Sequence, residues 1–87
     1  MIVESIMPDK IEVLIVDDHQ KLRRGIIALL AHAEDIRIVG EASTGAEAIA
    51  LVKRNPPHVV LIDLQMPEVD GIEATIAIKN NWPQVKV

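Results

Sequence analysis

The stretch Val13-Leu14-Ile15-Val16-Asp17-Asp18 is an apolar run that ends in two carboxylates, and Val59-Val60-Leu61-Ile62-Asp63 repeats the pattern further along the chain. Four consecutive branched aliphatic residues are typical of a strand that is buried on both faces of a parallel sheet. Ionised carboxylates beside buried strands are costly unless something compensates their charge. The two stretches therefore predict a parallel sheet with a cation-binding site at the ends of its strands.

Strand and helix patterns alternate along the rest of the chain. Thr44 and Glu47 have the spacing of a capping box at a helix start, and Asp70 and Glu73 repeat it. The expected elements are strands over Glu12–Asp17, Ile36–Ala42 and His58–Leu64, and helices over His19–Ala33, from Thr44 to the stop at Asn55-Pro56-Pro57, and from Asp70 to the stop before Trp82-Pro83; Val85–Val87 opens a further strand.

This alternation predicts an α/β fold with parallel strands, right-handed crossovers and helices on the faces of the sheet. We expect the strand order 2-1-3. In that order Asp17, Asp18 and Asp63 share one crevice at the carboxyl edge of the sheet, where open α/β sheets bind ligands.

Composition narrows the function classes. The 87 residues carry a net charge of -4 and no cysteine, which argues against a nucleic-acid surface and leaves no thiolate metal site. Lys21, Arg23 and Arg24 are expected to form a solvated helix face. No apolar stretch approaches the about 20 residues of a membrane span. We expect an N-terminal leader over residues 1–9, a single domain over residues 10–87, and a cytoplasmic location.

At this point the residues resemble a known family. Asp17-Asp18 after a buried strand, followed by Asp63-Leu64-Gln65-Met66-Pro67-Glu68-Val69-Asp70-Gly71, looks like the receiver domain of two-component response regulators. The resemblance covers the chain from about Lys10 to Val87. It implies a flavodoxin-like three-layer α/β/α sandwich with strand order 2-1-3, incomplete because the fourth and fifth strands are largely missing from this sequence. Further likeness to the NarL/FixJ subgroup lies in Val16-Asp17-Asp18-His19, Leu22-Arg23-Arg24-Gly25, and Val39-Gly40-Glu41-Ala42-Ser43 with Gly45.

The resemblance implies a role for each residue that matches the family motif. Asp63 matches the phosphoacceptor, which takes a phosphoryl group from a sensor histidine kinase. Asp18 matches the direct Mg²⁺ ligand, Asp17 its partner acting through bound water, and the backbone carbonyl of Gln65 a further ligand. Hard oxygen donors of this kind suit Mg²⁺. The implied purpose is to control an output domain, in this subgroup a transcription regulator, outside these residues.

Neighbouring residues have structural interpretations. Met66 is expected to pack in the core, since thioethers suit soft metals rather than Mg²⁺. Pro67 is expected to fix the loop, and Asp70 and Gly71 to be loop and cap residues. His19 is expected to face solvent at a helix start.

Receivers also carry a Ser or Thr after a fourth strand and a Lys after a fifth, and neither can be assigned up to Val87. One alternative is therefore a phosphorylation-incompetent pseudo-receiver, or truncated fragment, that acts as an interaction or dimerisation module. An aspartate-nucleophile phosphatase is a weaker alternative, because Gln65 stands where that class requires a second Asp. An uncovered sheet edge further predicts a homodimer through that edge or by swapping.

Overall fold

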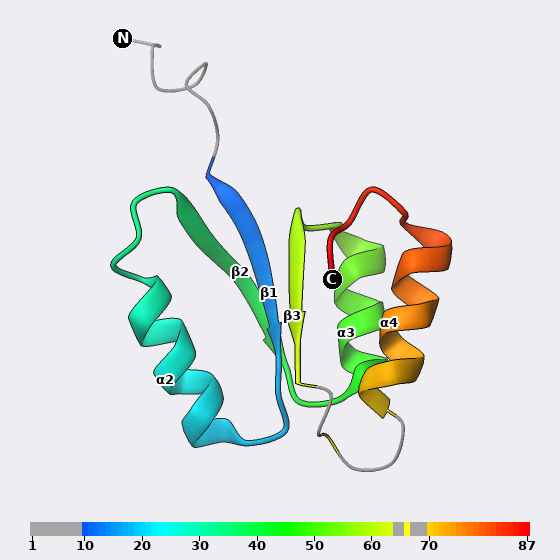
Figure 1. The fold of residues 1–87 in the computed structure, drawn as a ribbon, viewed down its shortest axis with the longest axis horizontal. Coiled ribbons are helices and arrows are strands. Elements are labelled where there is room, and N and C mark those ends of the chain that lie inside the picture. Colours follow the sequence, from blue (N-terminus) through cyan, green and yellow to red (C-terminus); the bar gives the residue numbers. More distant parts are fainter. Residues whose placement is uncertain (1–9, 64–65, 67–69) are drawn as a thin grey trace, which may run out of the picture.

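The computed structural model describes residues 10–63, 66 and 70–87 of the chain. The described residues form β1 (Ile11–Val16), α2 (Gln20–Leu30), β2 (Ile36–Ala42), α3 (Gly45–Arg54), β3 (Val59–Ile62) and α4 (Asp70–Asn81), as Figure 1 shows. The predicted alternation of strands and helices is confirmed. The predicted leader at residues 1–9, and the parts assigned to Gln65 and Pro67, lie outside the described residues.

The three strands form one parallel sheet in the order β2-β1-β3, which confirms the predicted topology. Val16 at the end of β1 pairs with Ala42 of β2 and Ile62 of β3, so the three carboxyl ends are level. The predicted further strand begins beside β3, where Lys86 forms a parallel bridge with Val59. The edge of β3 is therefore partly covered.

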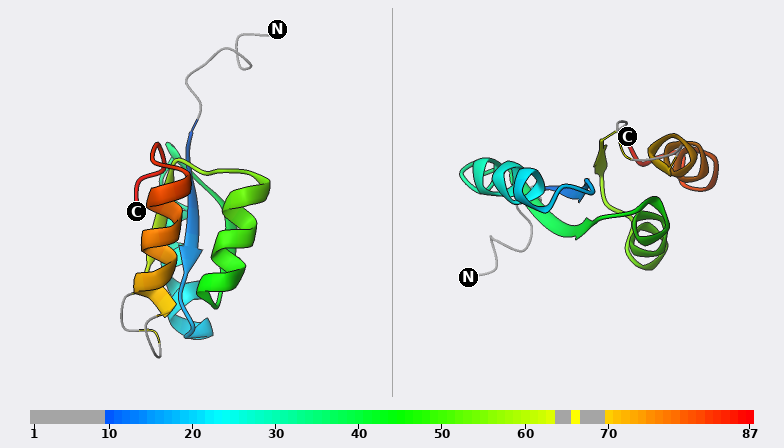
Figure 2. Two further views of the ribbon diagram at one scale, coloured as in Figure 1. Left: turned by 90° about the vertical axis from the view of Figure 1, so that its right-hand side faces the viewer. Right: turned by 90° about the horizontal axis from the view of Figure 1, so that it is seen from below.

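Helix α2 lies on one face of the sheet, and α3 and α4 lie on the other (Figure 2). The main core is on the α3 and α4 face, because alternate strand residues such as Leu14, Val16 and Val60 point there, where Val52 and Ile78 are fully buried. Met66 joins this core at 3% exposure, which confirms its predicted packing role.

The opposite face is packed less tightly. Helix α2, which is described in full, has no buried residue, and Leu22 and Leu29 are 54% and 75% exposed. The helix ends at Leu30, not at the predicted Ala33, because the N–H of Ala33 bonds to the Leu30 carbonyl in a tightened last turn. None of the described helices is long and apolar enough to cross a membrane.

The helix starts differ from the prediction in detail. Thr44 caps α3 as predicted, because its hydroxyl accepts the N–H of Glu47 at 3.1 Å. The Glu47 carboxylate reaches back to this turn and also accepts the N–H of Ser43 at 2.8 Å. Gly71 was predicted to lie in a loop or cap but lies buried within the first turn of α4. The side chain of Asp70, and so its predicted cap, lies outside the described part.

Candidate metal site at the carboxyl edge of the sheet

The sheet brings the predicted acidic residues to one place. Asp17 directly follows β1, and its N–H donates to the Ala42 carbonyl of β2 at 3.0 Å. Asp63 directly follows β3, and its N–H donates to the Val16 carbonyl of β1 at 3.0 Å. The ladder hydrogen bonds thus continue one residue beyond the strands, and they fix the backbone of both aspartates at the same edge.

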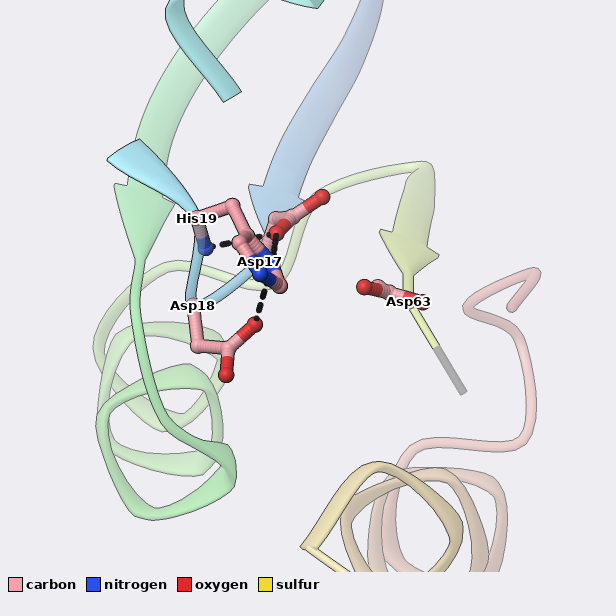
Figure 3. A group of neighbouring side chains, drawn as sticks. All are labelled: Asp17, Asp18, His19 and Asp63. Atoms are coloured by element: carbon pink, nitrogen blue, oxygen red, sulfur yellow. Dashed lines mark hydrogen bonds and ion pairs between the residues drawn. The ribbon is translucent and has the colours of Figure 1, made fainter. Parts of the chain in front are cut away.

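Four side chains converge there, as Figure 3 shows: Asp17, Asp18, His19 and Asp63. Each offers one possible ligand atom, and these atoms all lie within 4.8 Å of one another. Three of the four are the aspartates expected from the sequence. Among the described residues they form a donor set of three carboxylates and one imidazole.

The Asp17 carboxylate is almost fully buried, with its side chain 4% exposed. Its Oδ1 accepts the backbone N–H of His19 at 2.8 Å, an Asx turn in which the carboxylate satisfies a backbone donor two residues ahead. This bond offsets part of the cost of burying the charge. Asp17 therefore fixes the loop that leads from β1 into α2.

Asp18 presents an oxygen that requires a positive partner. Its side chain is 26% exposed, but its Oδ1 is buried and accepts no hydrogen bond from the described residues. The nearby His19 Nδ1, at 3.0 Å, offsets this charge only when the imidazole is protonated. A buried carboxylate oxygen without a donor is costly, and a divalent cation would satisfy it. The residues present therefore fit Mg²⁺, which prefers hard oxygen ligands.

His19 was expected to face solvent, and its side chain is indeed 69% exposed. Its ring nevertheless turns toward the acidic pair, with Nδ1 also 3.6 Å from Asp17 Oδ1. In the sequence, the feature that links His19 to the acidic site is its position directly after Asp17 and Asp18. His19 is the N-cap residue of α2, and sequence spacing does not specify the direction of its ring.

Arg23 holds the same loop through hydrogen bonds. The prediction that Arg23 lies on a solvated helix face is therefore wrong. Its side chain is only 12% exposed, and its guanidinium donates to the Asp17 carbonyl and, at 2.7 Å, to the Glu41 carboxylate. The neighbouring Arg24 does remain 64% exposed. Arg23 thus ties α2, the end of β1 and β2 together below the acidic cluster.

A hollow of about 330 Å³ adjoins the cluster on the α2 face. Asp17 and Asp63 stand among the apolar residues that line it, which are Ile15, Val16, Leu22, Ile26, Leu61 and Ile62. Apolar walls lower the local dielectric and strengthen the interaction between these carboxylates and a cation. The site is thus polar on its loop side and apolar on its sheet side.

The fold and this acidic edge are those of a receiver domain. The family model for the response regulator receiver domain matches residues 13–87, and the chain belongs to that family. It is therefore a receiver domain of two-component signal transduction, with the flavodoxin-like fold of that class.

Individual relatives and solved structures support the assignment to the receiver family. The response regulator protein VraR of Staphylococcus aureus is 48% identical over 77 residues, which cover 88% of this chain and 37% of VraR. The receiver domain of the putative response regulator NarL from Mycobacterium tuberculosis superposes with a TM-score of 0.77 at 37% identity, covering 84% of this chain and 59% of that one. RcsB of Salmonella typhimurium superposes with a TM-score of 0.79 at 31% identity, and the match covers 90% of this chain and 40% of the RcsB chain. The chain thus spans well under half the length of VraR.

Proposed function

We propose that this receiver domain accepts a phosphoryl group on Asp63 from the phosphohistidine of a sensor histidine kinase, with Mg²⁺ as cofactor. The observation that carries the proposal is the convergence of Asp63 with Asp17 and Asp18, whose ligand atoms lie within 4.8 Å of one another. Family membership supports the same assignment, because Asp63 lies within residues 13–87, which match the receiver domain family.

Each aspartate has a distinct part in this proposal. The buried Oδ1 of Asp18 is the direct Mg²⁺ ligand, and the Asp63 carboxylate is the second. Asp17, held by the N–H of His19, acts through a bound water. The backbone carbonyl of Gln65, outside the described residues, is the remaining expected ligand. Mg²⁺ bound there would neutralise the carboxylates and the phosphoryl oxygens, which otherwise repel each other.

The chemical step is a phosphoryl transfer between two nucleophiles. An oxygen of the Asp63 carboxylate attacks the phosphorus as the P–N bond to the donor imidazole breaks. The electron pair of that bond stays on the imidazole nitrogen, which takes up a proton from solvent. The product is an aspartyl phosphate. Because this chain supplies the nucleophile and the metal ligands, we expect it to catalyse its own phosphorylation and dephosphorylation, although it is not an enzyme in the ordinary sense.

The output of the response regulator is proposed from its relatives. NarL, RcsB and VraR are response regulators, and RcsB has been studied for its interaction with DNA. We infer that this receiver regulates a transcription output domain in the cytoplasm. Direct nucleic-acid binding by this segment is not expected, because its net charge is -4.

We also infer that a second copy of this chain is a partner. Leu61 of β3 and Val87 are 44% and 43% exposed, and both line a hollow beside the part of β3 that follows its bridge with Lys86. Pairing of two such edges would bury this apolar surface. Light scattering should show dimers of the 87-residue chain, fewer in Leu61→Lys; a strict monomer would contradict the inference.

Intact mass spectrometry tests the phosphoacceptor directly. Incubation with Mg²⁺ and acetyl phosphate should add one phosphoryl group to the chain, and Asp63→Ala should abolish the gain. Asp35→Ala is the matched control, because Asp35 is exposed and lies outside the acidic cluster. Continuous phosphate release without a mass gain would indicate a hydrolase instead. Mg²⁺ binding without either would indicate an interaction module.

A further inference from the structure

We propose that His19 is a metal ligand of this site and that it gives the site a preference for divalent ions that bind imidazole, such as Co²⁺ and Zn²⁺. The proposal rests on the proposed function, because it uses the same Asp17, Asp18 and Asp63. It goes further by assigning a nitrogen donor and therefore a metal selectivity that the carboxylates alone do not provide.

The distances suit a shared ion. Around a metal with ligands at about 2.1 Å, neighbouring octahedral donors lie about 3.0 Å apart and opposite donors about 4.2 Å apart. His19 Nδ1 and Asp18 Oδ1 are 3.0 Å apart, the separation of neighbouring donors. The four ligand atoms all lie within 4.8 Å of one another, which is close to the separation of opposite donors.

The backbone places His19 beside the acidic pair. His19 is the N-cap residue of α2, with an extended backbone at φ -96° and ψ 104°. Its N–H is bonded to Asp17 Oδ1 at 2.8 Å. Its side chain makes no capping hydrogen bond within α2, although Ser, Thr, Asp or Asn commonly does so at this position. The imidazole is therefore available for an ion, and little helix stability depends on it.

The chemistry of the donors decides the selectivity. Imidazole nitrogen suits Zn²⁺, Co²⁺ and Ni²⁺, whereas Mg²⁺ is bound by carboxylates, carbonyls and retained waters. A site of carboxylates alone has no particular preference for ions of the first group beyond their general affinity order. Because His19 lies at its solvent-exposed side, the Mg²⁺ form can retain a water where the imidazole would bind.

Calorimetric titration of the 87-residue chain with Co²⁺ and with Mg²⁺ tests the proposal. His19→Gln should weaken Co²⁺ binding by about tenfold or more, the scale on which metal sites respond to such changes. It should change Mg²⁺ binding less than about threefold, because water replaces the imidazole at little cost. The visible absorption of bound Co²⁺ should also shift to longer wavelength, because an oxygen ligand exerts a weaker field than nitrogen.

His32→Gln is the matched control, since His32 is exposed and lies outside the cluster. It should leave both affinities and the Co²⁺ spectrum unchanged. If His19→Gln leaves the Co²⁺ affinity and spectrum unchanged, or weakens both metals equally, the role of His19 is refuted and the carboxylate site stands. If the unmodified chain binds neither metal, the proposed function itself fails.

Discussion

Arg23 and Arg24 are adjacent in the sequence, but they should differ sharply in their contribution to stability. Both approach the Glu41 carboxylate, Arg23 Nε at 2.7 Å and Arg24 Nε at 3.7 Å. Arg23 is 12% exposed and also donates to the Asp17 carbonyl, whereas Arg24 is 64% exposed. Arg23→Ala and Arg24→Ala therefore compare a partly buried guanidinium with two hydrogen-bond partners and a solvated guanidinium that faces the same acid.

The cost of Arg23→Ala can be worked from its two bonds. A hydrogen bond that involves a charged group contributes about 1.5 kcal/mol or more when it is shielded from water. The bond to the Asp17 carbonyl belongs to this kind. The pair with Glu41 is discounted to at most about 1 kcal/mol, because the Glu41 side chain is 34% exposed. We therefore expect Arg23→Ala to lower the free energy of unfolding by about 2 kcal/mol, and Arg24→Ala by under about 0.5 kcal/mol.

Urea unfolding measures both changes. Trp82 is the single tryptophan and packs against the core, so its fluorescence reports the transition. With a slope of about 1 kcal/mol per molar urea for a small domain, Arg23→Ala should move the midpoint down by about 2 M. The midpoint of Arg23→Lys should lie between those of the parent chain and Arg23→Ala, because a single ammonium group cannot reproduce both hydrogen bonds of the guanidinium. Equal losses for the alanine variants of Arg23 and Arg24 would refute the assignment of Arg23 as a brace.

Three further predictions concern the core and the start of α3. Ile78→Ala should cost about 2–5 kcal/mol in urea unfolding, because Ile78 is fully buried, whereas Ile76→Ala, at a 55% exposed position of the same helix, should cost under about 0.5 kcal/mol. Thr44→Ala should cost about 1 kcal/mol by the same assay, because the Glu47 N–H loses its cap; no loss would contradict the capping role. Hydrogen bonds from the Ser43 N–H and then from the Ser43 hydroxyl lower the pKa of Glu47 below 4.5. Since the folded pKa is the lower one, the stability advantage over Glu47→Gln should be constant above about pH 4.5 and disappear as the pH falls through the folded pKa; an advantage that grows in acid would contradict this.

The sequence predicted the sheet and its acidic edge because both depend on local patterns and on topology. Apolar runs such as Val13–Val16 are short and rich in β-branched residues, and these two local features together favour a buried parallel strand over a buried helix. Once β1 is central, the residues that follow β1 and β3 must meet at one edge. Asp17, Asp18 and Asp63 could therefore be assigned to one site before any contact was known.

Side-chain directions could not be predicted in the same way. In the sequence Arg23 is one of three basic residues on a helix. Its low exposure depends on a contact with Glu41, which lies in strand β2. The ring of His19, the N-cap residue of α2, turns back to the acidic pair, and its side-chain torsions are not encoded in residue spacing. The exposure of Leu22 and Leu29 likewise follows from how α2 sits on the sheet, not from their helical spacing.

A Mg²⁺ titration of the isotopically labelled chain, followed through its amide resonances, tests the cation site most directly. We expect saturable shifts centred on Asp17, Asp18 and Asp63, because ligand atoms of their side chains lie within 4.8 Å of one another at the ends of β1 and β3. Asp18→Asn should abolish these shifts while leaving the fold intact. Shifts centred elsewhere, for example on the exposed acids Glu34 and Asp35, or shifts that persist in Asp18→Asn, would contradict the claim that the two strand ends form one cation site.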